Sequence, residues 1–315
     1  MTAQILAEGE LLGARPAQGR GRDLLRRALH DKQLVAALAF VLIEVLLIPL
    51  APVIAPYSPT RSSLASQLQP PSLIHLLGTD SNGTDILSRI LYAPRVDLVV
   101  AIAATLIAAA VGTPLGILAG YVRGAVGESL LRVGDIILTF PVFVLALVVV
   151  AALGQGESNV VLVVGFVQAP IYLRLTYGIS AALARRGYVE LARLSGASRT
   201  RIILRHILPN ASGPLFVQFS VTIGLSILLV SGLSYVGAGI QAPTPEWGSM
   251  IATGAQNLAT GQWWPSVFPG IAIGLTVVGF ALLSERISRL FEPGGSAPAS
   301  SSTSSQAHEE ISTND

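Results

Sequence analysis

Apolar stretches of about twenty residues are the feature that most limits what this chain can fold into. About 20 residues of helix, rising 1.5 Å per residue, cross roughly 30 Å of hydrocarbon. Because a backbone amide in lipid finds no water, each stretch must satisfy its own hydrogen bonds as a helix. The sequence therefore predicts an all-α membrane protein with six transmembrane helices, at approximately 34–54, 98–120, 133–153, 159–180, 213–237 and 266–284.

The charged residues agree with lipid as the main solvent and give the chain an orientation. They make up 12% of the sequence, against about 25% in soluble domains. With the N-terminus inside, all but three of the 20 Lys and Arg residues fall on the cytoplasmic side, and the exceptions are Arg61, Arg89 and Arg95. This bias predicts a multi-pass protein with both termini in the cytoplasm.

The spans divide the chain into five parts. A polar N-terminal arm, 1–33, has more positive residues and greater length than a signal-peptide n-region, so we expect an uncleaved cytoplasmic segment. The first span, 34–54, is followed by an external segment, 55–97, and then by a transmembrane core, 98–289. The tail, 290–315, is rich in Ser, Thr and Ala, and is predicted to be disordered in the cytoplasm.

Several kinds of chemistry are excluded by the residue types present. Without cysteine, the chain has no disulfide, thiolate zinc site or cysteine nucleophile. A phosphate-binding P-loop needs Gly-x-x-x-x-Gly-Lys-[Ser/Thr], and the only lysine, Lys32, follows His30 and Asp31. The chain therefore lacks that ATPase site, and we expect it to hold no catalytic, metal or cofactor site of its own.

Small and polar residues inside the spans give expectations about helix packing. Glycines recur every fourth residue in two spans, and missing side chains let helices approach closely. The alternative is the general glycine richness of membrane helices. Glu44 is expected to be protonated or paired against another helix, and Arg174 to reach the interface with its long side chain. The expected packing glycines are Gly112, Gly116, Gly120, Gly270 and Gly274.

The arginine-rich segment between the fourth and fifth spans predicts a compact helix–turn–helix at the membrane surface. Good helix formers run over 188–195, and Gly196 suits the left-handed position just past a helix end. Ser198 fits the N-cap of a second helix, and Pro209 is expected to stop that helix before the next span. The alternative is an amphipathic loop whose arginines contact lipid headgroups. A nucleic-acid partner is not expected beside a bilayer.

The same segment resembles the cytoplasmic loop of bacterial ABC importer permeases, which reads E-A-A, three residues, G, and then I-x-L-P. Leu191 replaces the second residue of the triplet, and His206 stands at the strict isoleucine position. The resemblance implies that this loop couples the chain to an ATPase. The residues concerned are Glu190, Leu191, Ala192, Gly196, Ala197, Ile207, Leu208 and Pro209.

Three further segments, 77–89, 232–237 and 243–248, resemble signatures of the dipeptide/oligopeptide/nickel permeases. Thr84 replaces a usual arginine, and Asp97 stands where the family often has serine. From the residues alone, aspartates cap turns, prolines stiffen a loop and Trp247 suits the membrane interface. We therefore favour a structural role over solute contact. The signature residues of the outer segments are Gly78, Thr79, Asp80, Gly83, Asp85, Ser88, Arg89, Pro243, Pro245, Trp247 and Gly248.

The resemblance covers about residues 34–289 and implies a permease subunit of the type I ABC importer fold, with a cytoplasmic coupling helix–turn–helix. It implies a bacterial inner-membrane location in contact with lipid, and three kinds of protein partner. These are a second homologous permease, two cytoplasmic ATPase subunits that bind ATP and Mg, and an external solute-binding protein. Di- or oligopeptides are the implied solute, with nickel or another small solute open.

Other kinds of membrane protein fit the sequence less well. A secondary transporter or channel often has ionisable groups near the midplane, and Glu44 alone offers little of that kind. A membrane-embedded enzyme would need an acid–base, metal or nucleophile cluster, which the sequence does not suggest. A structural scaffold would not explain four family-like segments.

Overall fold

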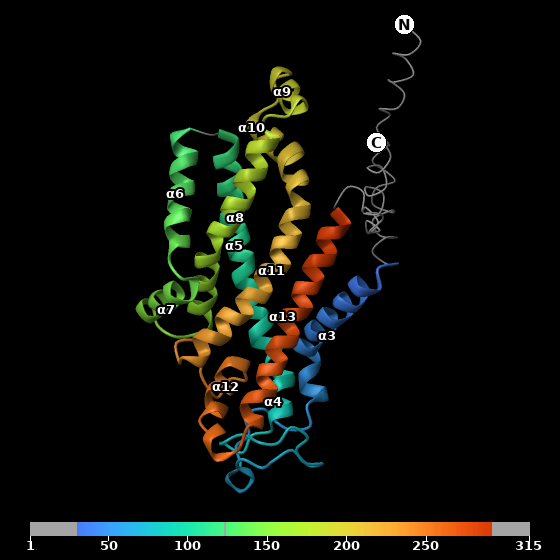
Figure 1. Cartoon of the computed structure of the whole chain (residues 1–315), viewed down its shortest axis with the longest axis vertical. Helices are drawn as coiled ribbons and strands as arrows, with labels where there is room; N and C mark the ends of the chain where they lie inside the picture. Colours follow the sequence, from blue (N-terminus) through green and yellow to red (C-terminus); the bar gives the residue numbers. More distant parts are fainter. Residues whose placement is uncertain (1–29, 123, 292–315) are drawn as a thin grey trace, which may run out of the picture.

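The computed structural model describes residues 30–122 and 124–291, and it shows long helices that run between two ends of a bundle (Figure 1). One end carries the short helices of the 185–210 segment, and we call it the loop end. The other end carries the 55–85 segment, and we call it the opposite end. The expected N-terminal arm and C-terminal tail lie almost wholly outside the described residues.

Within the described residues, five helices are long and apolar enough to cross a membrane, and a bent pair makes a sixth span. The all-α, six-span prediction is therefore confirmed. The long elements are α3 (Lys32–Ile54), α4 (Ile86–Tyr92) with α5 (Pro94–Val122), α6 (Ala125–Thr139) with α7 (Val142–Leu153), α8 (Glu157–Leu183), α10 (Arg199–Ile202) with α11 (Leu208–Tyr235), and α13 (Trp264–Phe291). The short ones are α9 (Gly187–Leu194), α12 (Trp247–Ala255) and 3-10 turns at Leu64–Ser66 and Leu258–Thr260.

Two apolar clusters hold the bundle together. One joins α5, α7, α8 and α11, around Val164 and Leu233, both of which are fully buried. The other joins α4, α5, α11, α12 and α13, with Trp247 at its centre. The opposite end is therefore packed by several helices, whereas α3 lies against α13, α4 and α5 and buries only Leu34, Ala37 and Ala51.

The tightest helix contact lies between α5 and α8, where the expected glycine triplet is found. A Cβ built on Gly112, Gly116 or Gly120 would lie 2.2–2.4 Å from a carbonyl oxygen of α8. Those oxygens belong to Ala169, Leu173 and Tyr177, which repeat with the same spacing of four residues. Only glycine allows the two backbones to approach this closely. The four-residue spacing of the glycines in the sequence therefore matches the spacing of the contacts along α8.

The second expected glycine pair does not form such a contact, which corrects the sequence-based expectation. A Cβ on Gly274 would meet nothing within 4 Å, and one on Gly270 would only touch Ile251 Cδ1 at 3.9 Å. Instead α13 meets α3 at Gly279, where a Cβ would lie 2.4 Å from a ring carbon of Phe40. A spacing of four residues defines a helix face, but it does not say which face has a neighbour.

The third apolar stretch, expected as one span at 133–153, is two helices bent by 92° at their junction. Pro141 stands at that junction and caps α7. Its ring and missing N–H interrupt a continuous helix. As a result α6 runs along the bundle beside α8 while α7 crosses it near the opposite end (Figure 1).

Pro209 does not stop the second helix of the loop, contrary to the sequence-based expectation. Residues Arg199–Tyr235 pass as one continuous helical span. The stretch Ile203–Ile207 forms a π-helical turn directly before Pro209. Such a turn shifts the hydrogen-bond register, so the chain can take up a proline without ending the helix. The loop is thus joined directly to a membrane span.

Candidate functional site

The segment that resembles the ABC importer loop folds as α9, a glycine turn and α10 at the loop end. The N–H of Gly196 donates to the Arg193 carbonyl, and the N–H of Ala197 donates to the Ala192 carbonyl. This pair of bonds is the Schellman motif that ends a helix at a left-handed residue. Gly196 has φ +81°, and Ser198 then caps α10 by accepting from the Arg201 N–H at 3.3 Å.

One side of this loop is anchored to the bundle. Val189, Ile202 and Ile207 are fully buried in a cluster that also contains Ile117 and Tyr121 of α5. Ala192, Ala197 and Leu208 pack against the edge of the same cluster. The Arg193 guanidinium lies 5.7 Å from the centre of the Tyr121 ring, over its face. The loop is therefore fixed to both α5 and α11.

The other side of the loop is not covered by any of the residues that the structure describes. Leu191 is 65% exposed and Leu194 is 79% exposed, and Glu190, directly before Leu191, is exposed as well. A Cβ on Gly196 would meet nothing within 4 Å, so its positive φ and not crowding within the chain requires glycine. Two leucines and a carboxylate on an anchored helix form a surface suited to another protein.

At the opposite end, the first signature segment is folded on itself by its aspartates. Asp80 Oδ1 accepts from the N–H groups of Asn82 and Thr84, both at 2.9 Å, and its other oxygen accepts from the Thr84 hydroxyl. Asp85 Oδ2 accepts from the Ser88 N–H and hydroxyl at 2.8 Å, which caps α4. The expected role of both aspartates in turns matches these bonds.

Close contacts hold the same segment against its surroundings. Gly78 and Gly83 both have positive φ, and a Cβ on Gly83 would lie 1.9 Å from the Ser63 carbonyl oxygen. The indole Nε1 of Trp264, at the start of α13, donates to the Thr79 carbonyl at 3.1 Å. Arg89 Nη1 donates to the Pro59 carbonyl at 3.2 Å. These signature residues are buried by their own segment, so they serve its fold.

The second outer signature leads into α12. Glu246 is fully buried and caps α12 by accepting from the N–H groups of Gly248 at 2.9 Å and Ser249 at 2.6 Å. Trp247 is 1% exposed, which corrects the expectation that it lies at the membrane interface. A Cβ on Gly248 would lie 2.1 Å from the Ser231 carbonyl oxygen of α11. Of the two prolines before this turn, Pro243 is exposed and Pro245 is half-buried.

A buried pair of carboxyl groups lies where this turn meets α5, and the sequence analysis did not predict it. Asp97 is fully buried, and its Oδ2 accepts from the Trp247 N–H at 3.1 Å. The Asp97 carboxyl therefore lies beside the buried Glu246 carboxyl, since it accepts from the residue that directly follows Glu246. Burial raises the pKa of the Glu246 carboxyl above its ordinary value, and the N–H groups at the helix start offset part of that rise.

Other ionisable groups lie within the helices that could span a membrane. Glu44 accepts from the Thr276 hydroxyl of α13 at 3.3 Å, as expected for an acid paired against another helix. Arg174 does not extend to the interface alone, because it forms an ion pair with Asp135 of α6. No group of three His, Cys, Asp or Glu residues that could hold a metal occurs in 30–122 or 124–291.

The chain matches two family models. Residues 112–295 match the "Binding-protein-dependent transport system inner membrane component", and 19–71 match the "N-terminal TM domain of oligopeptide transport permease C". The first match covers more than half of the chain and includes the α9–α10 loop. The chain belongs to the binding-protein-dependent transport permease family, whose members are the membrane-spanning subunits of ABC importers.

Relatives align with nearly the full length of this permease. It is 37% identical over 259 residues to an Escherichia coli (strain K12) protein named "Probable D,D-dipeptide transport system permease protein", covering 82% of this chain and 87% of the relative. It is 37% identical over 273 residues to the glutathione transport system permease of Pectobacterium atrosepticum (86% and 90% covered). The di/tripeptide transport system permease of Pseudomonas aeruginosa is 35% identical over 270 residues (84% and 89% covered).

Proposed function

We propose that this permease is the translocating subunit of an ATP-driven importer of di- or oligopeptides in a bacterial inner membrane. It works by alternating access, with both termini in the cytoplasm. Its partners are a second homologous permease, two cytoplasmic ATPase subunits and an external solute-binding protein. ATP and Mg bind to the ATPase subunits, since this chain has no P-loop lysine.

The observation that carries the proposal is the two-sided α9–α10 loop. Its exposed side, with Glu190, Leu191 and Leu194, offers an apolar and acidic surface to a partner. Its buried side packs on α5 and continues into α11. A partner that moves when it binds ATP would therefore move membrane helices directly. Such rigid-body transfer between two states is the usual way in which separate subunits are coupled.

The choice of peptides as the solute rests on the relatives. Those compared above are named for a D,D-dipeptide, for di- and tripeptides and for glutathione. These solutes share peptide-type amide bonds and carry both amino and carboxylate groups. Nickel or another small solute is the alternative, and within the described residues no candidate metal cluster favours it.

Copurification tests the proposed coupling surface. Glu190→Arg should reduce the amount of ATPase that copurifies with the tagged permease by about tenfold. The reason is that the substitution places a positive charge where the partner surface is expected to pair with a carboxylate. Glu285→Arg on α13, another exposed acid, is the matched control and should retain the ATPase. Peptide uptake into proteoliposomes should require ATP and no ion gradient. Equal ATPase recovery with both variants, or uptake driven by an ion gradient alone, would favour a secondary transporter or channel instead.

A further inference from the structure

A charged stripe is exposed on α6, the first half of the bent pair of helices that makes the sixth candidate span. Glu128, Arg132 and Asp135 are spaced by four and three residues, so they lie on one face of the helix. All three are exposed. Asp135 is about 15 Å along α6 from its start, since a helix rises 1.5 Å per residue. This is close to half the thickness of the hydrocarbon core.

The stripe faces charged and polar residues of α8. Arg174 pairs with Asp135, and the two side chains are 62% and 50% exposed. Nearer the loop end, Glu128 lines a hollow of about 460 Å³ together with Tyr177 of α8 and Arg185, which lies just past the end of α8. The ion pair and this hollow both lie along the boundary between α6 and α8, which we call the α6–α8 groove. The two helices lie next to each other at one edge of the bundle, away from α3 and α13 (Figure 1).

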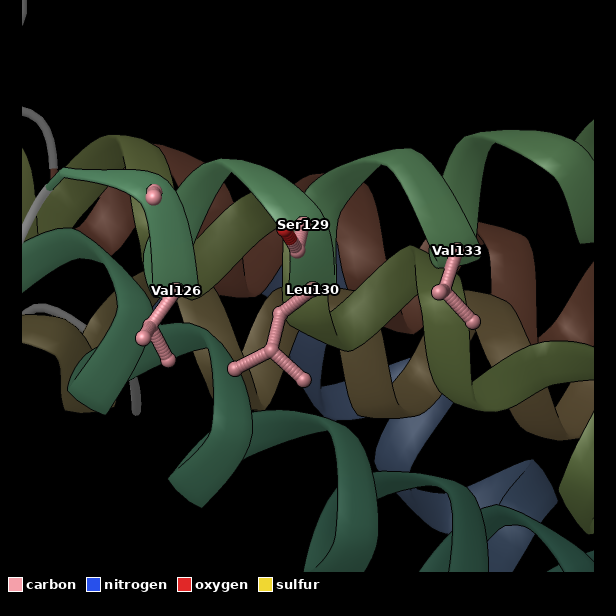
Figure 2. Close-up of a pocket in the computed structure, with 5 residues that line it drawn as sticks. Val126, Ser129, Leu130 and Val133 are labelled. Atoms are coloured by element: carbon pink, nitrogen blue, oxygen red, sulfur yellow. The ribbon is translucent and has the colours of Figure 1, made fainter.

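A second exposed side of α6 is apolar and provides a contrast. Val126, Leu130 and Val133 lie in a row with Ser129 along the helix and line a separate hollow of about 360 Å³ (Figure 2). Such a side is compatible with acyl chains. The charged side is not, because ionisable groups at this depth face water or other protein groups. Glu44 and Asp97, by contrast, each accept one hydrogen bond from within the bundle.

We propose that the α6–α8 groove is a water-filled part of the translocation path that receives the two charged ends of a zwitterionic peptide. Arg174 and Arg185 would attract its carboxylate, and Glu128 and Asp135 its ammonium group. A guanidinium and a carboxylate already paired with each other present both partners that a zwitterion needs. This inference rests on the proposed function, because it assigns a place to the peptide that the importer carries.

Cysteine labelling tests whether the groove contains water, and it does not depend on the solute. The chain has no cysteine, so single variants report on one position each. In the assembled complex, Arg132→Cys should react with a membrane-impermeant methanethiosulfonate, and Val133→Cys, on the apolar side, should not. An unreactive Arg132→Cys in the complex would overturn the proposal. Reaction only in the isolated permease would do the same, since the groove would then be covered by the second permease.

Transport of three dipeptides tests whether the charges act on the solute. Alanyl-alanine, alanyl-glutamate and alanyl-lysine would be supplied to the complete reconstituted complex. Arg174→Gln should lower uptake about tenfold while ATPase association is unchanged. The exchanged pair Asp135→Arg with Arg174→Asp keeps an ion pair but moves its charges. It should leave uptake low and change the ratio of alanyl-glutamate to alanyl-lysine transport.

A control variant on α13 separates an effect of the groove from a general effect of losing an exposed ion pair. Arg289→Gln removes a comparably exposed ion pair on α13, Arg289 with Glu285, and should leave uptake unchanged. Full recovery of uptake in the exchanged pair, with an unchanged ratio, would show a purely structural pair and overturn the proposal. A wild-type complex that imports none of the dipeptides would instead overturn the proposed function, and the labelling result would still decide whether the groove holds water.

Discussion

The two ends of the bundle treat their signature residues in opposite ways. At the opposite end, Thr79, Asp85 and Glu246 are buried and bonded to their own chain. At the loop end, Glu190 and Leu191 are exposed, and only the residues behind them are anchored. Both segments resemble family signatures equally well in sequence. Resemblance to a family signature therefore does not show whether a residue stabilises the fold or contacts a partner.

Glycine shows the difference within one residue type. Gly83 and Gly196 both have positive φ, but a Cβ on Gly83 would run into the Ser63 backbone, while one on Gly196 would enter open space. The first is needed by the chain itself. The second is needed for a turn whose exposed surface is the proposed contact with the ATPase. Substitutions at the opposite end should therefore lower the stability of the permease, whereas substitutions at the loop end should lower its assembly with partners.

The largest effect is expected from Gly83→Ala. The added Cβ would lie 1.9 Å from the Ser63 carbonyl oxygen, so the backbone must move. The loss of stability should reach about 3 kcal/mol or more, since overpacking adds to backbone strain. Gly261→Ala is the matched control at the same end, because Gly261 also has positive φ but open surroundings. It should cost about 1 kcal/mol. Thermal melting of the purified permease would compare them, and equal losses would contradict the crowding argument.

Gly196→Val should leave folding nearly intact and affect assembly. A β-branched residue with positive φ is strained by about 2 kcal/mol, but the strain is confined to an exposed turn. Membrane insertion and melting should stay close to wild type, while ATPase copurification and peptide uptake fall severalfold. Gly196→Asn should restore both, because asparagine tolerates the left-handed region. Wild-type assembly in the valine variant would mean that the turn does not position the coupling surface.

The smallest effect concerns pH at the opposite end. Burial raises the pKa of Glu246 in the folded protein, so the folded state keeps a proton that the unfolded chain releases above about pH 4.5. Stability should therefore fall as pH rises from that value, by a few degrees in melting temperature. Glu246→Gln should flatten this dependence, whereas Glu157→Gln, an exposed acid, should leave it unchanged. A wild-type melting temperature that rises from pH 5 to 8 would contradict the sign.

The sequence predicted the helical architecture well because membrane spans are a local property. Length and hydropathy define the spans, and the Gly196 turn and the Ser198 cap depend on neighbours within a few residues. The helix geometry at Pro141 and Pro209 was harder to predict. Both are prolines beside an apolar helix, yet one marks a bend of 92° and the other lies in a continuous helix after a π-helical turn. The register shift that separates the two cases depends on the surrounding packing.

Contacts between distant segments could not be predicted. Asp97 and Glu246 lie far apart in the sequence, and neither their residue types nor their spacing predicts that they are neighbours. Arg174 and Asp135 look like isolated charges in two different spans until α6 and α8 are placed side by side. The sequence also could not distinguish Gly274, which has open surroundings, from Gly116, which has a carbonyl oxygen against it. Each of these depends on which helix faces are neighbours.

The uninterrupted helix from Arg199 to Tyr235 has a mechanical consequence. Its 37 residues make a rod about 55 Å long, at 1.5 Å per residue. If the rod is held at the opposite end, where Gly248 touches Ser231, a tilt of about five degrees moves its α10 end by about 5 Å. A hinge at Pro209 would have absorbed that movement locally. Because Pro209 lies within one continuous helix, a displacement of its α10 end would tilt the whole helix, including the part at the opposite end of the bundle.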